Sequence, residues 1–425
     1  MKAKARWALS GIVSGAAVLS LASAAYAQVN TQEIKAPASA SSDRFGFSVA
    51  TDKSGNAAVI GAPSTNPPTA NDNGQAFIYT RAAKGWKEQA KLTPSKSYAQ
   101  DLFGSAVAMN SAGNVAIVGA PGNAFAITQS CCLGEATGPG AAFIFTKKGN
   151  TWKQTAMLTG VSGTSFGFSV SVNPAGTEAL VGAVGENGNE GAAYLFAKNK
   201  KGAWNLQQKL TDPGLSHTAL PGDNFGFSVS LQNKVALVGA DQANDNGAPA
   251  VGPGFADIYV KKGTKWSTKQ QLTASPTGAD GDSFGYAVSL DKAGNAALVS
   301  APGARSYEGL AYVFSAGKKS WSQRQTLADP AGTSGDYFGN AVALDGNAKV
   351  AEIGAPDTQN YAGLADRYSG TVGKWKRPLT QSDSSNPSDY GFSVALATNG
   401  DVELVSATGE DNNSGYGVVY VYKFS

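Results

Sequence analysis

FGFSVA, residues 45–50, is the stretch that decides the fold, because the chain repeats it seven times. The copies begin near residues 45, 103, 166, 225, 284, 338 and 390, and after the first they read FGSAVA, FGFSVS, FGFSVS, FGYAVS, FGNAVA and YGFSVA. A small residue followed by Ala, such as Gly61-Ala62, comes sixteen residues after the first aromatic in six copies and fourteen after it in the fourth. So regular a spacing indicates a repeat architecture.

Each copy contains four short segments with the character of β-strands. In the first copy these are 45–50, an apolar run that ends at Gly61-Ala62, the aromatic-rich 76–79, and a segment that opens with Trp86. Short strands separated by turns, with one aromatic signature per unit, are typical of a β-propeller. The 52 glycines and the low charged fraction of 15% also favour strands and tight turns. The sequence therefore predicts an all-β, seven-bladed β-propeller with four-stranded antiparallel blades.

The two ends of the chain complement each other. The seventh copy stops at its third strand, 418–424, and no segment opening with Trp follows. Before the first copy, 31–35 has strand character, and its Ile34 matches a Leu that recurs in the fourth strands. We expect this N-terminal strand to complete blade seven and close the ring, which would leave no open sheet edge.

Residues 1–27 have the features of a secretory signal peptide. Three basic residues lie within the first six, an apolar segment follows, and Ala25-Tyr26-Ala27 fits a signal peptidase site. We expect cleavage after Ala27, a secreted or periplasmic protein, and one propeller domain over 28–425. The alternative is an N-terminal membrane anchor, for which this segment is short. No later apolar run reaches the ~18 residues of a transmembrane helix, so we expect no such segment in the mature chain.

The Phe-Gly pair followed by Gly-Ala-Pro, as at Gly61-Ala62-Pro63, resembles the FG-GAP repeat. The resemblance covers essentially all of the chain after residue 27. It implies the seven-bladed propeller of integrin alpha subunits and of many bacterial secreted proteins. Propellers with this repeat serve adhesion, lectin and enzyme-associated roles, so the resemblance implies a scaffold and not a single activity.

The turns between the first and second strands depart from that family. Integrin-type blades often carry a calcium loop, D-x-D-x-D-G-x-x-D, at this position. The turns here, such as TDKSGN and LDKAGN, do not offer enough oxygen ligands for calcium, so a calcium cofactor is possible but unsupported. We expect no cofactor and no metal site. We interpret the carboxylates of these turns as local caps, namely Asp52, Asp291, Asp345 and Asp401.

The sequence shows no catalytic motif. It has one His, His217, and no G-x-S-x-G elbow, phosphate loop or H-E-x-x-H helix. A net charge of +3 gives no nucleic-acid signature. We interpret the six blade Trp residues as packing residues. Five copies carry an Asp two residues before the Phe (Asp43, Asp101, Asp223, Asp282 and Asp336), which we interpret as a turn residue; the alternative is a ring of metal or sugar ligands at the channel mouth.

The two ends of the predicted ring differ in charge and in loop length. The loops after the second and fourth strands lie at one end and hold about two thirds of the 31 acidic residues. The turns between third and fourth strands lie at the other end and hold thirteen Lys and Arg with no acid. The loop after the second strand varies widely in length, whereas the opposite turns stay short. We therefore predict that ligands bind the acidic, loop-rich face; the alternative is neutral surface variation.

The predicted ligand-binding residues lie in the long loops of this face. They are Asp72, Tyr98, Cys131, Cys132, Asp245, Tyr307, Glu308 and Tyr361. The adjacent Cys131 and Cys132 lie in the longest insertion, 122–140, and in an oxidising compartment we expect a disulfide that stiffens it. Contact of this pair with a ligand and intermolecular pairing both stay open.

The predicted function is that of an exported binding or adhesion module. It would recognise a glycan, a peptide or a cell-surface ligand, act as a monomer and bind no nucleic acid. Two alternatives stay open: a carbohydrate-active hydrolase or lyase that uses loop carboxylates, and a structural subunit of an envelope assembly.

Overall fold

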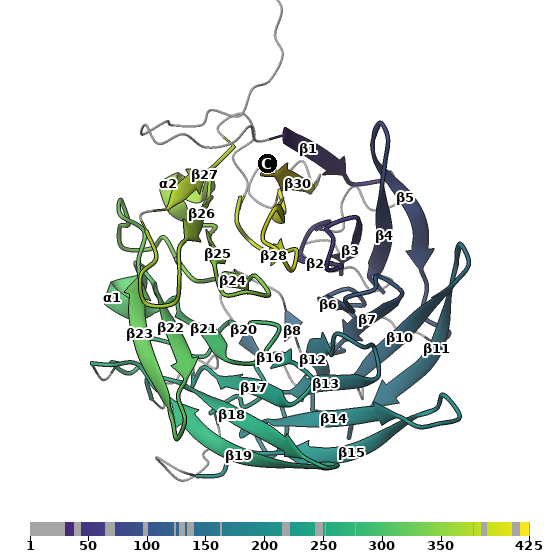
Figure 1. The fold of residues 1–425 in the computed structure, drawn as a ribbon, viewed down its shortest axis with the longest axis horizontal. Coiled ribbons are helices and arrows are strands. Elements are labelled where there is room, and N and C mark those ends of the chain that lie inside the picture. The colour runs from purple at the N-terminus through teal and green to yellow at the C-terminus, as the bar shows by residue number, and fades with distance from the viewer. Residues whose placement is uncertain are drawn as a thin grey trace, which may run out of the picture.

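Seven four-stranded antiparallel sheets form a ring in the computed structural model (Figure 1). The structure describes residues 30–37, 44–63, 73–96, 101–122, 125–126, 132–133, 140–161, 164–214, 222–242, 250, 252–276, 278–376, 378–383, 389–409 and 417–424. The predicted all-β, seven-bladed architecture is confirmed. Within these ranges, no helix is long and apolar enough to cross a membrane.

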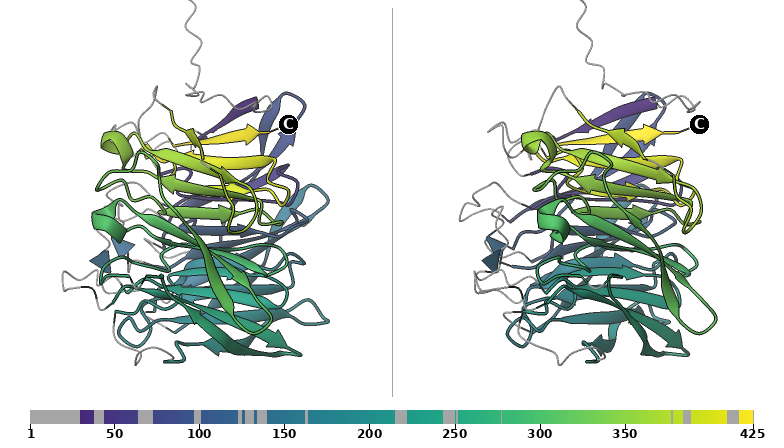
Figure 2. Two further views of the ribbon diagram at one scale, coloured as in Figure 1. Left: turned by 60° about the vertical axis from the view of Figure 1, so that its left-hand side comes forward. Right: turned by 90° about the vertical axis from the view of Figure 1, so that its left-hand side faces the viewer.

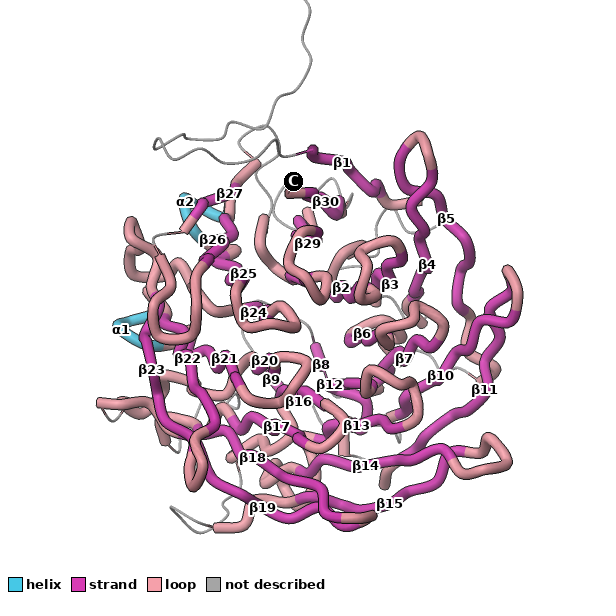
Figure 3. Tube along the Cα trace, in the orientation of Figure 1, coloured by secondary structure: helices cyan, strands magenta, loops and turns pink. Residues whose placement is uncertain are grey.

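Each blade places its first strand towards the ring centre and its fourth strand at the periphery (Figure 3). Blade one consists of β2 (Ser48–Thr51), β3 (Ala57–Ala62), β4 (Gln75–Ala82) and β5 (Gly85–Leu92). Blade two consists of β6 (Ala106–Met109), β7 (Val115–Ala120), β10 (Ala141–Lys148) and β11 (Thr151–Thr159). Blade three consists of β12 (Phe166–Val172), β13 (Glu178–Ala183), β14 (Ala192–Lys198) and β15 (Trp204–Leu210). Blade four consists of β16 (Ser228–Leu231), β17 (Val235–Ala240), β18 (Phe255–Lys262) and β19 (Lys265–Leu272). Blade five consists of β20 (Val288–Leu290), β21 (Ala296–Ala301), β22 (Leu310–Ala316) and β23 (Trp321–Leu327).

The last two blades differ slightly from this pattern. Blade six consists of β24 (Ala341–Leu344), β25 (Val350–Ala355), β26 (Leu364–Ser369) and the short β27 (Leu379–Gln381). We expected its fourth strand to open at Trp375, but only two residues separate Trp375 from Pro378, which has no N–H to donate, and the strand begins after that proline. Blade seven consists of β28 (Val394–Leu396), β29 (Val402–Ala407), β30 (Val418–Lys423) and β1 (Asn30–Lys35).

The pairing of β1 with β30 closes the ring, as predicted. Ile34 lies opposite Val419, just as Leu92 lies opposite Ala76 in blade one. Its side chain is buried in the cluster between blades seven and one. The N-terminal strand therefore supplies the core residue that each fourth strand contributes.

The Phe-Gly pair forms the middle of a β-turn at the start of each blade. In blade one the Phe47 N–H donates to the Arg44 carbonyl at 3.0 Å, and Gly46 has a φ of +93°, which a type II turn requires at its third position. β2 consequently begins at Ser48, later than the alternation of the sequence predicts. Gly61 is needed for close approach, because an added Cβ would lie 2.0 Å from the Gly104 carbonyl of the next blade.

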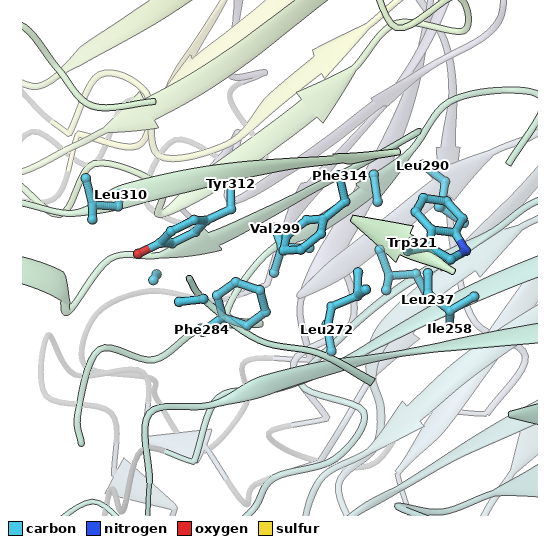
Figure 4. Packing of buried hydrophobic residues seen from close by; sticks show 14 of the residues in the cluster. Leu237, Ile258, Leu272, Phe284, Leu290, Val299, Leu310, Tyr312, Phe314 and Trp321 are labelled. Carbon is cyan, nitrogen blue, oxygen red and sulfur yellow. The ribbon is translucent and has the colours of Figure 1, made fainter. Parts of the chain in front are cut away.

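Apolar clusters between neighbouring blades make up the core. In the cluster between blades four and five, Phe284 packs on Tyr312 with ring centroids 5.3 Å apart, and Trp321 is buried at the other end of the cluster, near Leu237 (Figure 4). The Gln270 side chain bonds the backbone N–H and C=O of Trp321 at 2.7 and 3.0 Å. These contacts agree with the interpretation of the Phe-Gly aromatics and of the Trp residues as scaffold.

Most of the turn carboxylates cap their own turns. Asp52 Oδ1 accepts the amides of Asn56 and Ala57 at 2.8 and 2.9 Å, and Asp291 and Asp345 repeat the arrangement. Asp401 differs, because Ala397 occupies the capping position in blade seven and Asp401 Oδ1 makes no hydrogen bond.

The Asp residues before the Phe-Gly pairs also include turn acceptors. Asp282 accepts the Ala279 amide at 2.9 Å, and Asp336 accepts the Thr333 amide at 2.6 Å. Asp43 lies outside the described residues.

Candidate ligand site at the channel mouth

The two ends of the ring are built differently. Two short helical turns, α1 (Ala304–Tyr307) and α2 (Thr358–Tyr361), and the small ribbon of β8 (Phe125–Ala126) and β9 (Cys132–Leu133) lie at one end (Figure 2). We call this end the loop-rich face; it consists of the loops after the second and fourth strands. The turns between third and fourth strands lie at the opposite end, which we call the hairpin face.

A cavity of about 480 Å³ occupies the centre of the ring on the side of the loop-rich face. Its walls are first-strand residues, and its rim includes Arg44, Tyr337, Asp357 and Asp389. Deeper in the channel each of the seven blades contributes one valine: Val49, Val107, Val170, Val229, Val288, Val342 and Val394. A concave and mostly apolar site with a few polar groups at its rim is the usual form of a ligand pocket.

An aromatic collar surrounds the mouth of this cavity. The residue after each Phe-Gly pair forms it, and in five of the seven blades that residue is Phe47, Phe168, Phe227, Tyr286 or Phe392. Phe227 lies 4.9 Å from both Phe168 and Tyr286, centroid to centroid, and Phe47 lies 5.0 Å from Phe392. Blades two and six interrupt the aromatic series.

The polar residues at those two positions have different surroundings. Asn340 of blade six bridges the collar, because its Oδ1 accepts from the Tyr286 hydroxyl at 3.4 Å and its Nδ2 donates to the Phe392 carbonyl at 2.9 Å. Ser105 of blade two instead donates to the Leu102 carbonyl at 2.6 Å. The collar is therefore open towards blade two, which also carries the longest loop of the loop-rich face.

A buried guanidinium lies on the collar. The Arg44 Cζ is 4.8 Å from the Phe47 ring centroid and 5.8 Å from that of Phe392, which is within range of a cation–π contact. Burial lowers the pKa of Arg44 to about 9, and the nearby charge of Asp389 opposes that shift. The mouth thus combines aromatic faces with one cation and a neighbouring carboxylate.

Exposed tyrosines extend this surface outward. Tyr307 is 49% exposed, and its ring centroid lies 5.0 Å from that of Tyr337 on the cavity rim. Arg305, Ser306 and Tyr307 have φ values of 55°, 60° and 65°, so three successive residues hold the left-handed conformation that presents Tyr307. Tyr361, in the equivalent loop of blade six, is 41% exposed, and its carbonyl accepts the Asp389 amide at 2.9 Å.

Three of the eight predicted ligand-binding residues can be placed on this face with their side chains. They are Tyr307, Tyr361 and Glu308, and Glu308 forms an ion pair with Arg305 at 3.2 Å. The backbone of Cys132 lies in β9, paired with Ala126. The remaining four, Asp72, Tyr98, Cys131 and Asp245, and with Cys131 the expected disulfide, lie outside the described residues, as does His217.

The acidic residues of this face are less exposed than their number in the sequence suggests. More than half of its described carboxylates are buried: Asp101, Glu186, Asp223, Asp241, Asp329, Asp336, Asp383 and Asp389. Some of these carboxylates hold neighbouring side chains in place. Asp389 accepts a hydrogen bond from the Thr408 hydroxyl at 3.0 Å, and Glu186 accepts hydrogen bonds from the Tyr194 hydroxyl and the Lys209 ammonium. The exposed character of the described face is therefore aromatic and polar as much as acidic.

Three carboxylates in the described part of the chain have a raised pKa and lie outside the cavity lining. Burial raises the pKa of Asp257 to about 8, and it also raises those of Asp329 and Glu352; none of the three is among the residues that line the cavity. Within the described part of the chain, no group of three or more His, Cys, Asp or Glu side chains is arranged to hold a metal ion.

The collar residues are not among the binding residues predicted from the sequence. The signal for the collar was present, because the third position of the repeat is aromatic in five of the seven copies although the fold does not require it.

Comparison with known proteins identifies the repeat. The family described as FG-GAP repeat matches residues 29–79, 86–145, 204–252, 266–314 and 321–372. These segments cover more than half of the chain and contain the Phe-Gly turns at Phe45, Phe103, Phe225, Phe284 and Phe338. No curated protein matches the chain.

Proposed function

Because the chain belongs to the FG-GAP repeat family, we propose that it is an exported binding or adhesion module that takes its ligand at the mouth of the central channel. The ligand is a glycan, a peptide or another cell-surface group. Export follows from the signal peptide predicted over residues 1–27, with cleavage after Ala27. The aromatic-lined cavity on the loop-rich face is the observation that carries the proposal.

The residues around that cavity suit recognition. Tyrosine supplies a large, rigid contact area at little entropic cost and keeps a hydroxyl for hydrogen bonding. Val161, Leu206, Tyr307 and Tyr361 are the exposed large hydrophobic side chains in the described ranges, and both tyrosines stand on the same face as the cavity. Apolar area left exposed beside a concave site commonly marks an interaction surface.

A glycan-array and cell-surface binding screen of the secreted protein tests this proposal. The double variant Tyr307→Ala, Tyr361→Ala should weaken binding to any ligand found by about tenfold or more, because central aromatic residues often contribute ~2 kcal/mol to an interface. Leu206→Ala is the matched control, since Leu206 is 55% exposed but lies on the peripheral strand β15. The control should bind normally.

If the tyrosine variant kept full binding, the proposal that the ligand binds at the loop-rich face would be wrong. Unfolding temperatures should be similar for all three proteins, because the altered side chains are exposed. Sequencing the exported protein from its N-terminus tests the export step separately, and the first residue should be Gln28.

A further inference from the structure

The hairpin face carries a positive charge, and ligand binding at the loop-rich face gives no reason for it. Twelve lysines, one arginine and no acid occupy the six turns between third and fourth strands. These turns lie at the end of the ring opposite α1 and α2 (Figure 2). Six of the lysines form exposed pairs in three of the turns: Lys200 and Lys201, Lys262 and Lys265, and Lys318 and Lys319.

Most of the carboxylates at this end are engaged within the fold; Asp401, whose Oδ1 makes no hydrogen bond, is the exception. Asp291 Oδ1 accepts the amides of Asn295 and Ala296 at 2.6 and 2.8 Å, and Asp52 and Asp345 do the same in their turns. Glu178 is buried and forms an ion pair with Lys261, the one hairpin lysine with an ion pair in the described structure. Since most of these acids are held inside and the exposed lysines far outnumber Asp401, the charge presented to solvent is positive.

The turns between first and second strands extend the positive surface towards the ring centre. Lys53, Lys234, Lys292 and Lys349 lie in four of these turns and are exposed. The turns of neighbouring blades are tied together, since the Lys53 amide donates to the Ser111 carbonyl at 3.2 Å and the Gly346 amide donates to the Thr398 carbonyl at 2.8 Å. The lysines therefore stand on a connected platform around the channel.

We propose that this lysine face binds an anionic lipid surface. Lysine is a strongly hydrated point charge, which suits a diffuse layer of negative headgroups, whereas a discrete phosphate site favours the planar fork of arginine. The hairpin turns are uniformly short and arranged in a ring, so they can meet a plane together. The cavity at this end, about 140 Å³, is lined by the first turns of the blades, and it is small for a sugar or nucleic-acid chain.

The proposed contact is electrostatic and shallow. None of the exposed large hydrophobic side chains described above lies in a turn of the hairpin face, so nothing there is suited to enter the acyl layer. Each lysine near an anionic lipid surface strengthens binding about fivefold, and the attraction fades beyond ~10 Å at 0.1 M salt. This contact does not depend on what the loop-rich face binds.

Sedimentation of the full protein with lipid vesicles tests the proposal. The protein should bind vesicles of equal parts phosphatidylcholine and phosphatidylglycerol, should not bind vesicles of phosphatidylcholine alone, and should be released by sodium chloride. In the face variant, Lys200, Lys201, Lys318 and Lys319 are each changed to Gln, and its binding to the anionic vesicles should be about a hundredfold weaker or worse.

A control variant with the same loss of charge separates this face from net charge. It carries Gln at Lys87, Lys153, Lys269 and Lys376, which are exposed in or beside the fourth strands on the outer wall of the ring. Circular dichroism and thermal unfolding of both variants should match the parent protein, because all eight side chains are at the surface. The control should keep its vesicle binding within about threefold.

Four results would overturn the proposal: no binding to anionic vesicles, equal binding to neutral vesicles, binding that high salt does not reverse, or equal losses in the two variants. Capture of a soluble polyanion such as heparin or DNA without vesicle binding would likewise assign the face to a different class of partner.

Discussion

Asp257 and Glu352 are carboxylates at positions where other blades carry large apolar side chains. Asp257, on β18, takes the place of Phe77 and Tyr312, and Glu352, on β25, takes the place of Ile117. Both have no measurable solvent exposure. Desolvation is the main cause that raises the pKa of Asp257 to about 8, and the charge of Asp212 adds to it, while the neighbouring Gln271 side chain opposes it.

The surroundings of Glu352 raise its pKa for related reasons. Burial is the largest cause, followed by the nearby charge of Glu403, whereas Arg367 opposes the shift. Arg367 forms an ion pair with Glu403, with 2.5 Å between the guanidinium nitrogen and the carboxylate oxygen. The Gln381 side-chain amide also donates to Glu403. Tyr390 and Tyr422 complete this network with hydroxyls 2.5 Å apart. Glu352 therefore keeps its proton in the folded protein at pH values where an exposed glutamate has lost it.

These buried acids predict that stability falls as pH rises. Between pH ~4, where an unfolded Asp ionises, and about 8, the folded protein binds one more proton at Asp257 than the unfolded chain does, so the free energy of unfolding decreases across that interval. Asp257→Asn should raise the free energy of unfolding at pH 8 by ~2–4 kcal/mol and change it little at pH 4. Urea unfolding at the two pH values measures the difference. The exposed Asp280→Asn should have little effect at either pH, and an equal gain for Asp257→Asn at both would contradict the titration argument.

At the scale of elements, the repeat itself allowed accurate prediction. The blade count, the four strands and the closing strand all followed from recurring residues, because such residues mark contacts that recur from blade to blade, such as Gly61 against the Gly104 carbonyl, with Ser in place of that glycine in blades five and seven. Strand ends were less predictable. β2 starts after a type II turn that alternation alone cannot distinguish from strand, and β27 starts late because Pro378 precedes it.

The closing strand gives the prediction at this scale. Ile34 is 2% exposed on β1, so Ile34→Ala should lower the free energy of unfolding by ~2–4 kcal/mol through the lost burial and the cavity left behind. Thr31→Ala, on the same strand but exposed, should stay within ~0.5 kcal/mol of the parent protein in urea unfolding. Deleting residues 28–36 should expose the edge of β30 and cause aggregation. A stable, monomeric deletion variant would show that β1 does not hold the ring closed.

At the scale of the whole molecule, the sequence predicted which end of the ring carries the long loops but not how the site is assembled. The number of acidic residues in its loops predicted an acidic face, yet many of those carboxylates are buried and bond within their own loops. The sequence alone does not show which side chains are buried. The collar brings together residues up to 345 positions apart, from Phe47 to Phe392, and it exists only because seven equivalent positions converge on one axis. Tyr307 was predictable as a loop aromatic; its stacking on Tyr337 was not.

The opposed faces predict a single orientation on an anionic membrane. If the hairpin face lies against the lipid, the native lysines report it, because acetylation followed by mass spectrometry measures how accessible each one is. On vesicles that contain phosphatidylglycerol, Lys200, Lys201, Lys262, Lys318 and Lys319 should react several times more slowly than in free protein. Lys87, Lys153 and Lys269 on the outer wall should react at the same rate in both, because a disc lying flat leaves its entire wall in water. Protection of wall lysines on only one side would mean that the protein binds edge-on, which would also cover part of the loop-rich face. Protection confined to the hairpin face would leave the aromatic collar and Tyr307 open to a ligand from the solvent side.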